Sequence, residues 1–505
     1  MNRKYLRLAA SLIIAPASLA VMAEITLPPL LTDNMVIQRD TEAPLWGTAT
    51  PGATVTITPS WGKSVPVSTV AAADGRWMTK VATPAAGGPY TITIAEGKTD
   101  RVTLKNVMSG EVWLCSGQSN MDMPLHGWGT IFDHEREIAE ADHPGLRLMQ
   151  VKWNKSFTPL DTFESTGGGW QQCAPSNIAG FSAAAYFFGR DLNERLGVPV
   201  GLIQASWGGT PAEAWISAET LGRFPHFDNA LAALRGEKVD SLALELYHPK
   251  GDLGFYDNPK TPTVLYNAMI RPLAPYAIKG VIWYQGEDNV GRARQYRELL
   301  PALVADWERL WGQKLYFGIA QLANFLPRKD RPSESAWAEL REAQMMTAEG
   351  LGDRGFIACL IDNGTADDIH PRDKQTVGHR LALGALRKAY RLDVAEGGPR
   401  FGSYRIDKDK VIVHMISNCD ITYSKNGFPI KGVEIAGKDR VFHPADVLVM
   451  GENLIVSSPM VPAPVAVRYA WADNPDCNLI DNSGLPAYPF RTDDFPMLSD
   501  SHEGY

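Results

Sequence analysis

The middle of the chain alternates amphipathic helical segments with short apolar runs that are rich in β-branched residues. The helical segments and the apolar runs that follow them are residues 186–197 and 198–206, 293–311 and 314–322, and 334–350 and 355–362. This alternation is typical of a parallel β-sheet whose two faces are covered by helices. It predicts an α/β unit over residues 108–395, which ends in a further helix at 371–390.

Short strands with turn residues between them are predicted on both sides of this unit. Residues 24–107 contain alternating apolar and polar runs at 53–58, 75–81, 90–94 and 101–107, which favours a β-sandwich. Residues 396–505 contain a second set of such runs, and we expect this region to pack back on the α/β unit. Three units agree with a length of 505 residues, because domains usually have roughly 100 to 200 residues.

The first 23 residues have the order of features found in a signal peptide. Arg3, Lys4 and Arg7 precede an apolar run, and small residues lead up to Ala23, where we expect cleavage. A buried N-terminal helix is the alternative. No other window has the 18 or more apolar residues of a membrane span. The sequence therefore predicts an exported protein, periplasmic or secreted, with no membrane span after the leader is removed.

Charge and cysteine content exclude several classes of partner. The formal net charge is -8 and there is no basic block, so nucleic acid is not an expected partner. The five cysteines include no CxxC pair, which disfavours a zinc site, and we expect no metal and no cofactor. In an oxidising compartment Cys419 and Cys477 could pair, while at least one cysteine remains free. The sequence leaves the oligomeric state open.

Polar residues follow four of the predicted strands directly. These four segments are residues 116–120, 207–210, 285–287 and 363–371. Functional residues of an open α/β sheet gather at the carboxyl ends of its strands. Together the segments supply a hydroxyl nucleophile, an imidazole base, carboxylates and oxyanion donors, which are the groups that acyl transfer to water requires.

The candidate nucleophile and base each have a structural alternative. Ser119 is predicted near a helix N-terminus, where serine is also a favoured cap. His370 precedes Pro371, a residue preferred at the first position of a helix, which would fix the imidazole at the mouth of the sheet. Either Asp367 or Asp368 could accept the Nδ1 proton of His370, and the other would then cap a helix or face solvent.

The remaining two segments offer oxyanion donors and aromatic side chains. Gly209 could bring a backbone N–H close to a developing oxyanion, or could simply form a tight turn. Gln285 offers a side-chain amide, and Glu287 could hold its turn or contact substrate. The aromatic residues near these turns could face sugar rings or pack in the core. They are Trp207, Trp215, Trp283 and Tyr284.

The motifs "GQSNM", "ASWGGTPAEAW", "WYQGEDN" and "DDIHPRDKQTVGHRLAL" occur in this order along the chain. In this combination the chain resembles the sialate O-acetylesterase family of carbohydrate esterases, a branch of the SGNH hydrolases. The resemblance covers nearly all of the chain after residue 23. It implies an α/β fold with a three-layer αβα hydrolase domain, flanked by β-sandwich-like regions at both ends.

The resemblance also implies a role for each site residue. Ser119 matches the nucleophile and His370 the base, and the usual spacing of the acid three residues before the histidine selects Asp367. The implied oxyanion donors are the backbone N–H groups of Ser119 and Gly209 and the side chain of Gln285. Residues expected to contact substrate are Gln118, Asn120 and Glu287.

These observations predict an esterase that removes O-acetyl groups from sugars through a Ser-His-Asp acyl-enzyme mechanism. The resemblance favours O-acetylated sialic acid as the substrate. Acetylated xylan, xyloglucan or pectin oligosaccharides are an alternative, because the acidic chain slightly disfavours an anionic sugar. A noncatalytic carbohydrate-binding protein is the alternative from another class, although such a protein would not need Ser119, Asp367 and His370 on separate strand ends.

Overall fold

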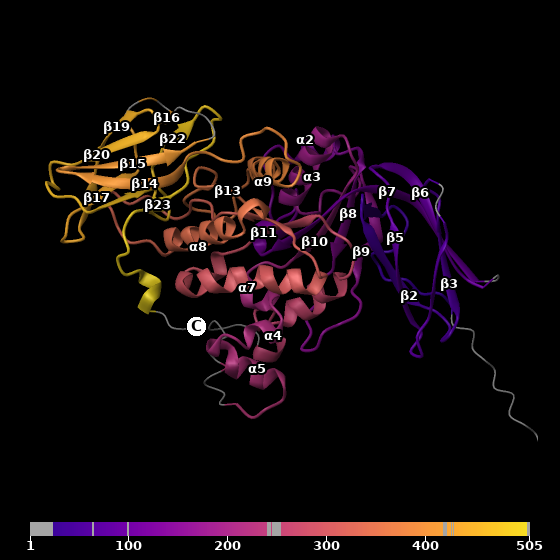
Figure 1. Ribbon diagram of the computed structural model, residues 1–505. Coiled ribbons are helices and arrows are strands. Elements are labelled where there is room, and N and C mark those ends of the chain that lie inside the picture. Colours follow the sequence, from indigo (N-terminus) through magenta and orange to yellow (C-terminus); the bar gives the residue numbers. More distant parts are fainter. Residues whose placement is uncertain are drawn as a thin grey trace, which may run out of the picture.

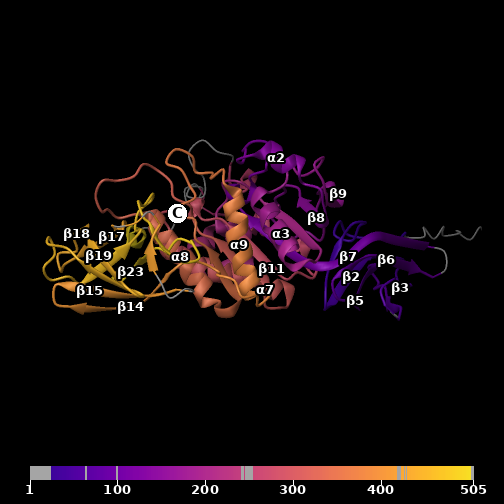
Figure 2. The same cartoon turned by 90° about the horizontal axis from the view of Figure 1, so that it is seen from above.

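The computed structural model describes residues 24–501, apart from residues 63–64, 98–99, 240–243, 245–253, 418–421, 426 and 428. A central α/β unit lies between an N-terminal and a C-terminal β region, so the molecule is elongated (Figures 1 and 2). The predicted signal peptide and Cys419 lie outside the described residues. The leader and the pairing of Cys419 with Cys477 therefore stay predictions.

The central unit is built on a sheet with the strand order β13-β12-β11-β7-β10-β8-β9. All neighbours are parallel except the last pair, β8 and β9, which is antiparallel. In the same order the strands are Gly355–Ala358, Tyr316–Ala320, Gly280–Tyr284, Asp100–Gly117, Val200–Ser206, His143–Val151 and Ser165–Cys173. Every residue of β10 and β11 is buried, as expected for parallel strands covered on both faces.

Helices cover both faces of this sheet (Figure 1). One face packs against α3 (Ala183–Leu196) and α9 (Lys374–Lys388), and the other against α7 (Ala293–Trp311) and α8 (Ala336–Gly350). Strand β7 divides its side chains between the two cores, because successive residues of a strand point to opposite faces. Trp113 contacts the α3 and α9 side, and Leu114 the other side. This arrangement confirms the predicted three-layer fold.

The shorter helices connect these layers. They are α1 (Ser119–Asp122), α2 (His134–Ala139), α4 (Ala218–Leu221) and α5 (Asp228–Leu234), with 3-10 or π helices at Ala212–Trp215, Pro225–Phe227, Phe255–Asp257, Tyr266–Ile270, Arg271–Leu273, Glu287–Asn289, Gly352–Arg354 and Leu498–Ser501. Within residues 24–501, less the gaps given above, no helix combines the length and the apolar composition that crossing a bilayer requires.

Strand β7 runs without a break from the N-terminal β region into the central sheet. Its first half pairs antiparallel with β6, and its second half pairs parallel with β10 and β11. The sequence predicted a strand at 101–107, a domain boundary after residue 107, and a separate strand that ends just before residue 116. One continuous strand takes their place, so a shared backbone ladder joins the two regions. The other N-terminal strands are β1 (Val36–Gln38), β2 (Glu42–Thr48), β3 (Thr54–Pro59), β4 (Val67–Val70), β5 (Arg76–Ala82) and β6 (Gly87–Glu96).

The C-terminal region consists of antiparallel strands that contact the central unit. Arg341 of α8 donates hydrogen bonds to the carbonyl oxygens of Ala472 (2.7 Å) and Asp473 (2.9 Å). The hydroxyl of Tyr488 donates to the carbonyl oxygen of Ile357 in β13 at 2.7 Å. The strands are β14 (Arg400–Asp407), β15 (Lys410–Ile416), β16 (Thr422–Ser424), β17 (Val433–Ala436), β18 (Phe442–Pro444), β19 (Asp446–Met450), β20 (Asn453–Ser457), β21 (Ala466–Tyr469), β22 (Leu479–Asp481) and β23 (Phe490–Arg491).

The helix after His370 begins later than the sequence predicted. Pro371 was expected at the first helical position, but α9 begins at Lys374 and is capped by Asp373, whose side chain accepts a hydrogen bond from the backbone N–H of Thr376 at 2.9 Å. A carboxylate that satisfies a free N–H of the first turn sets the start of the helix. His370 therefore lies in a loop, and other contacts must hold it.

Candidate functional site

A pocket of about 590 Å³ lies where the turns after β7, β10 and β11 meet the loop that carries His370. Five predicted site residues line it, whereas Asn120, Gln285 and Asp367 do not. The lining residues are Gln118, Ser119, Asp122, Trp128, Trp153, Trp207, Gly208, Gly209, Glu287, Asp288, Ile369 and His370. The candidate nucleophile and base, which are 251 positions apart in the sequence numbering, thus face the same space.

Ser119 is held at a tight turn between strand β7 and helix α1. The strand ends at Gly117, whose φ is 140° and where a Cβ atom would come within 2.1 Å of the carbonyl oxygen of Tyr284. Only glycine allows this approach of β11. The cap position of α1 is Gln118, so Ser119 is the first helical residue rather than the cap.

The side chain of Gln118 braces this turn against the turn after β11. Its Oε1 atom accepts hydrogen bonds from the backbone N–H groups of Gly286 (3.2 Å) and Asp288 (3.3 Å). These two bonds fix the orientation of the amide, because its oxygen must face the two donors. These two bonds do not involve the amide nitrogen of Gln118. Gln118 also lines the pocket.

The turn after β10 lies directly against Ser119. A Cβ atom at Gly208 would lie 3.3 Å from the Cβ atom of Ser119, so the backbones are close here. Gly209 has a φ of 64°, in the left-handed region that glycine adopts without strain. Since a Cβ at Gly209 would meet no atom within 4 Å, the need for glycine there comes from backbone conformation and not from space.

The imidazole of His370 is partly buried between Trp128 and its own loop. The ring of Trp128 lies edge-on to it, with centroids 5.3 Å apart. Burial lowers the pKa of His370 below its ordinary value, and the nearby ammonium group of Lys374 lowers that pKa further. The carboxylate of Asp368 acts in the opposite direction. A neutral imidazole at neutral pH can accept a proton, as a general base must.

The carboxylate beside His370 belongs to Asp368. Its Oδ1 atom accepts a hydrogen bond from the backbone N–H of His370 at 2.8 Å and lies 3.3 Å from Nδ1. Asp367, which the resemblance had selected, is exposed, as Asp368 is, and neither of them lines the pocket. The contacts with His370 are therefore what distinguish Asp368. Of the two candidate acids, the structure thus places Asp368 against the imidazole, because the Asp368 carboxylate accepts a hydrogen bond from the backbone N–H of His370.

Gln285 does not reach the pocket, which differs from the prediction that it donates to an oxyanion. Its side chain is fully buried, and Nε2 donates to Oδ1 of Asn289 (2.6 Å) and to the carbonyl oxygen of Thr210 (3.3 Å). The hydroxyl of Tyr296 donates to its Oε1 at 2.8 Å. These partners use both ends of the amide inside the protein. The glutamine that lines the pocket is Gln118.

Asn120 also faces protein groups rather than the pocket, although the sequence placed it among the residues that contact substrate. Its side-chain amide donates to Glu287 Oε1 (2.6 Å) and to the carbonyl oxygen of Ile369 (3.0 Å), and accepts from Lys374 Nζ (2.6 Å). Glu287 both joins this network and lines the pocket. Burial raises the pKa of Glu287.

Sequence reasoning missed four residues of the pocket wall, which are Asp122, Trp128, Trp153 and Asp288. Trp153 and Trp207 stack with ring centroids 5.4 Å apart and an interplanar angle of 14°, and the side chain of Trp153 is largely exposed. The indole N–H of Trp153 donates to Asp122 Oδ1 at 3.4 Å, and Ser206 Oγ donates to the same oxygen at 2.9 Å. Burial raises the pKa of Asp122 to about 6. Asp122 follows Ser119 by three residues, a helical spacing that could have indicated its place, whereas no local pattern marks Trp128 or Trp153.

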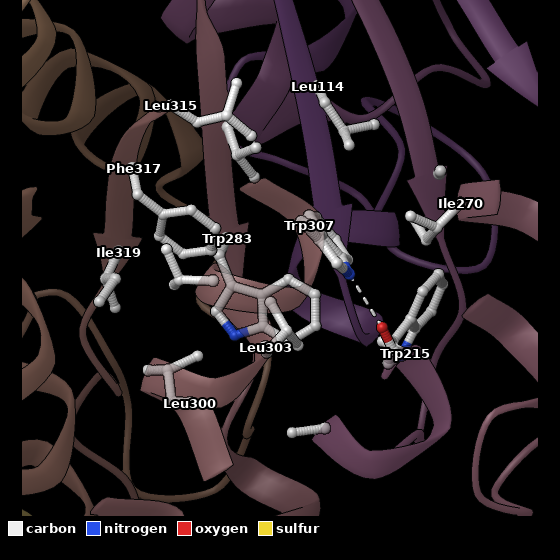
Figure 3. Close-up of a cluster of buried hydrophobic side chains, with 14 of the residues drawn as sticks. Leu114, Trp215, Ile270, Trp283, Leu300, Leu303, Trp307, Leu315, Phe317 and Ile319 are labelled. Carbon is white, nitrogen blue, oxygen red and sulfur yellow. Dashed lines mark hydrogen bonds between the residues drawn. The ribbon is translucent and has the colours of Figure 1, made fainter. Parts of the chain in front are cut away.

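The other aromatic residues near the predicted turns belong to the core. Trp215, Trp283 and Tyr284 are fully buried. In Figure 3 the indole of Trp283 lies among Leu300, Leu303 and Phe317, and Trp307 donates its indole N–H to the carbonyl oxygen of Trp215 at 2.9 Å. Core packing is therefore their role, and of the four aromatic residues considered from the sequence only Trp207 faces the pocket.

Comparison with known proteins identifies related chains over nearly the full length. Residues 109–248 match the family model described as carbohydrate esterase, sialic acid-specific acetylesterase. The human sialate O-acetylesterase is 31% identical over 91% of each chain, and the mouse sialate O-acetylesterase is 29% identical over 95% of this chain and 96% of its own. The crystal structure of a carbohydrate acetylesterase from Xanthomonas citri is 37% identical, covers 93% of this chain and 100% of its own, and superimposes with a TM-score of 0.81.

Proposed function

This chain belongs to the sialate O-acetylesterase family of carbohydrate esterases, and we propose that it hydrolyses O-acetyl esters of sugars through Ser119 and His370. The observation that carries the proposal is the single pocket that both residues line, at the carboxyl ends of three strands. A noncatalytic sugar-binding protein would have no reason to bring a serine on a glycine-supported turn and a histidine of lowered pKa to one pocket.

The proposed reaction proceeds through an acetyl-enzyme. His370 takes the hydroxyl proton of Ser119 while Oγ attacks the acetyl carbonyl carbon, and the tetrahedral adduct collapses as His370 returns the proton to the departing sugar oxygen. Water then attacks the acetyl-enzyme with His370 again as the base, and acetate and free Ser119 result. Asp368 stabilises the imidazolium that forms in both steps.

We assign the oxyanion donors to the turns that surround Ser119. The backbone N–H groups of Ser119 and Gly209 stand at the ends of β7 and β10, and the Gln118 amide replaces that of Gln285, which is used inside the protein. Donors that are already fixed before the reaction stabilise the developing charge without reorganisation. The brace from Gln118 to the turn after β11 supplies this rigidity.

The sugar is proposed to lie against the wall formed by Trp128, Trp153 and Trp207. Aromatic faces suit the apolar face of a sugar ring. Trp153 stacks with Trp207, and its indole N–H donates a hydrogen bond to Asp122 Oδ1 at 3.4 Å. Sialic acid is the first candidate, because the human and mouse relatives are sialate O-acetylesterases. A neutral acetylated sugar is the second, because the lining side chains include Asp122, Glu287 and Asp288 but no lysine or arginine among the described residues.

Release of acetate from defined sugars tests the function and separates the two substrate classes. We expect the purified protein to release acetate from O-acetylated sugars faster than the Ser119→Ala protein does. The panel compares 9-O-acetyl sialic acid with its methyl ester, which is uncharged, and with acetylated xylo-oligosaccharides. Faster turnover of the uncharged compounds would favour a neutral sugar. A protein that binds these sugars but releases no acetate from any of them would contradict the proposed function.

Replacing Trp153 with alanine is expected to raise KM for acetylated sugars by roughly 3- to 10-fold, with little change in kcat, because aromatic contacts of this kind contribute about 0.5 to 1.5 kcal/mol. Hydrolysis of ethyl acetate, which has no ring, should be unchanged. Trp153→Phe is the matched variant and should restore most of the affinity. An equal loss of kcat with the acetylated sugar and with ethyl acetate would instead indicate that Trp153 acts by holding Asp122 in position.

A further inference from the structure

A polar bridge with the buried side-chain amide of Asn120 at its centre adjoins the pocket, because two of its members, Glu287 and Ile369, line the pocket. Lys374 Nζ donates to Asn120 Oδ1 at 2.6 Å, and Asn120 Nδ2 donates to Glu287 Oε1 at 2.6 Å. The same nitrogen donates to the carbonyl oxygen of Ile369 at 3.0 Å. One neutral amide therefore separates a buried ammonium group from a carboxylate.

The charged groups fix the orientation of this amide. The ammonium of Lys374 has only donors, and the carboxylate of Glu287 and the carbonyl of Ile369 have only acceptors. If the amide of Asn120 were reversed, nitrogen would face nitrogen and oxygen would face oxygen on every side. The bridge is thus directional, running from Lys374 through Asn120 to Glu287.

A charged lysine is costly in this position. Lys374 is fully buried and is the first residue of α9, where the free backbone N–H groups already give the helix end a partial positive charge. Burial lowers the pKa of Lys374 to about 7, and Glu287 opposes this effect. The ring of Tyr284, whose centroid lies 5.1 Å from Nζ, adds a cation–π contact. An alkyl side chain would avoid the cost, so the position calls for an explanation beyond packing.

The bridge connects the three segments that the proposed reaction requires. Asn120 directly follows Ser119, Ile369 directly precedes His370, and Glu287 is in the turn after β11. Because α9 begins only at Lys374, the loop that carries His370 has no helical support of its own. Asn120 contacts this segment on both sides of His370, at Ile369 before it and at Lys374 after it. These contacts fix the position of the loop relative to Ser119.

We propose that Lys374 and Glu287 are positioning residues, which act through Asn120 to hold His370 against Ser119, and that the ammonium of Lys374 keeps the imidazole in its neutral form. The inference rests on the proposed function, since it assigns His370 as the base. It adds an electrostatic partner to that base, whose effect on the pKa of His370 is opposite in sign to that of Asp368.

The charges that face His370 come from several elements. Asp368 lies on its own loop, Lys374 on α9, Asp122 on α1, and Glu287 and Asp288 in the turn after β11. The positive charge of Lys374 lowers the pKa of His370, and the negative charge of Asp368 raises it. Removing that positive charge should therefore raise the pKa of His370.

Replacing Lys374 with methionine is expected to lower kcat/KM by about 10- to 100-fold, the usual cost of losing a residue that orients a functional group. In the acidic limb of the pH profile, kcat/KM falls as the base is protonated. The midpoint of this fall should shift to higher pH by about 0.5 to 1 pH unit. Lys388→Met is the matched control, because it removes a lysine from the other end of α9, where the partner is Glu396. A purely structural role would reduce activity at every pH without moving the acidic limb, and that result would overturn the proposal.

A second variant and a spectroscopic readout guard against misfolding and against failure of the proposed function. The double variant Lys374→Met/Glu287→Gln removes both charges, so it should unfold at a higher temperature than Lys374→Met, which leaves the Glu287 carboxylate without its cation. Titration of ¹³C-labelled His370 by NMR in the Ser119→Ala background measures its pKa without any turnover. An upward shift on adding Lys374→Met supports the proposal even if no acetylated sugar is hydrolysed, and an unchanged pKa refutes it.

Discussion

Replacing Ser119 with alanine is expected to lower kcat/KM for acetylated sugars by at least about 10⁴-fold, because the acetyl-enzyme can no longer form. The pocket should stay intact, since Ser119 is only partly buried and the hydrogen bonds from Gly286 and Asp288 to Gln118 do not involve the Ser119 side chain. The measurement is acetate release under saturating and limiting substrate. A small residual rate above the uncatalysed reaction is compatible with the mechanism, because the oxyanion donors remain.

Ser116→Ala serves as the matched control. Ser116 precedes Ser119 by three residues, near the end of strand β7, is fully buried, and donates to the carbonyl oxygen of Ala205 at 2.6 Å. It should lose about 1 kcal/mol of stability and keep its turnover. A serine-directed phosphonate should label the wild-type peptide that contains Ser119 and leave Ser119→Ala unlabelled. Wild-type turnover by the alanine variant would eliminate Ser119 as the nucleophile.

The parts of this fold that the sequence predicted are those governed by local pattern. Buried parallel strands are continuous apolar runs, and turn residues must follow them, so the ends of β7, β10 and β11 could be recognised. The carboxyl ends of parallel strands share one edge of the sheet. This geometry alone brings Ser119 and Gly209 to the pocket that His370 also lines.

The parts that could not be predicted depend on partners far away in the sequence. Gln118 and Gln285 both follow apolar strands, and nothing local distinguishes them. Gln285 turns inward because Asn289 and Tyr296 bond both ends of its amide, whereas Gln118 lines the pocket. The continuity of β7 likewise depends on its pairing with β6 at one end and with β10 at the other. The residue pattern of one strand does not show which strands it will pair with.

The buried lysine illustrates the same limit. In the sequence, Lys374 is one of two cationic residues near the start of a helix, and such residues are usually solvated. Its burial follows from Asn120, Glu287 and Tyr284, which come from two other segments. Polar networks of this kind are hard to predict from sequence, because each side chain forms hydrogen bonds with partners that only the fold brings close to it.

Replacing Asp368 with asparagine is expected to lower kcat by about 10²- to 10⁴-fold, while Asp367→Asn should have little effect. Asparagine keeps the Oδ1 acceptor for the backbone N–H of His370 and removes only the negative charge, so the loop should keep its shape. Without that charge the imidazolium that forms in each step is less stable. Rapid-quench measurement of acetyl-enzyme formation, with a sugar acetate in excess, separates this chemical step from product release.

The pH dependence of the Asp368→Asn variant provides a check that the rate alone does not. Because the Asp368 carboxylate raises the pKa of His370, its loss should lower that pKa and move the acidic limb of kcat/KM to lower pH. This shift is opposite in sign to the one expected for Lys374→Met, so the two variants bracket the wild-type profile. If Asp367→Asn instead lost the activity and moved the limb downward, Asp367 would be the acid, and the loop would have to rearrange when substrate binds.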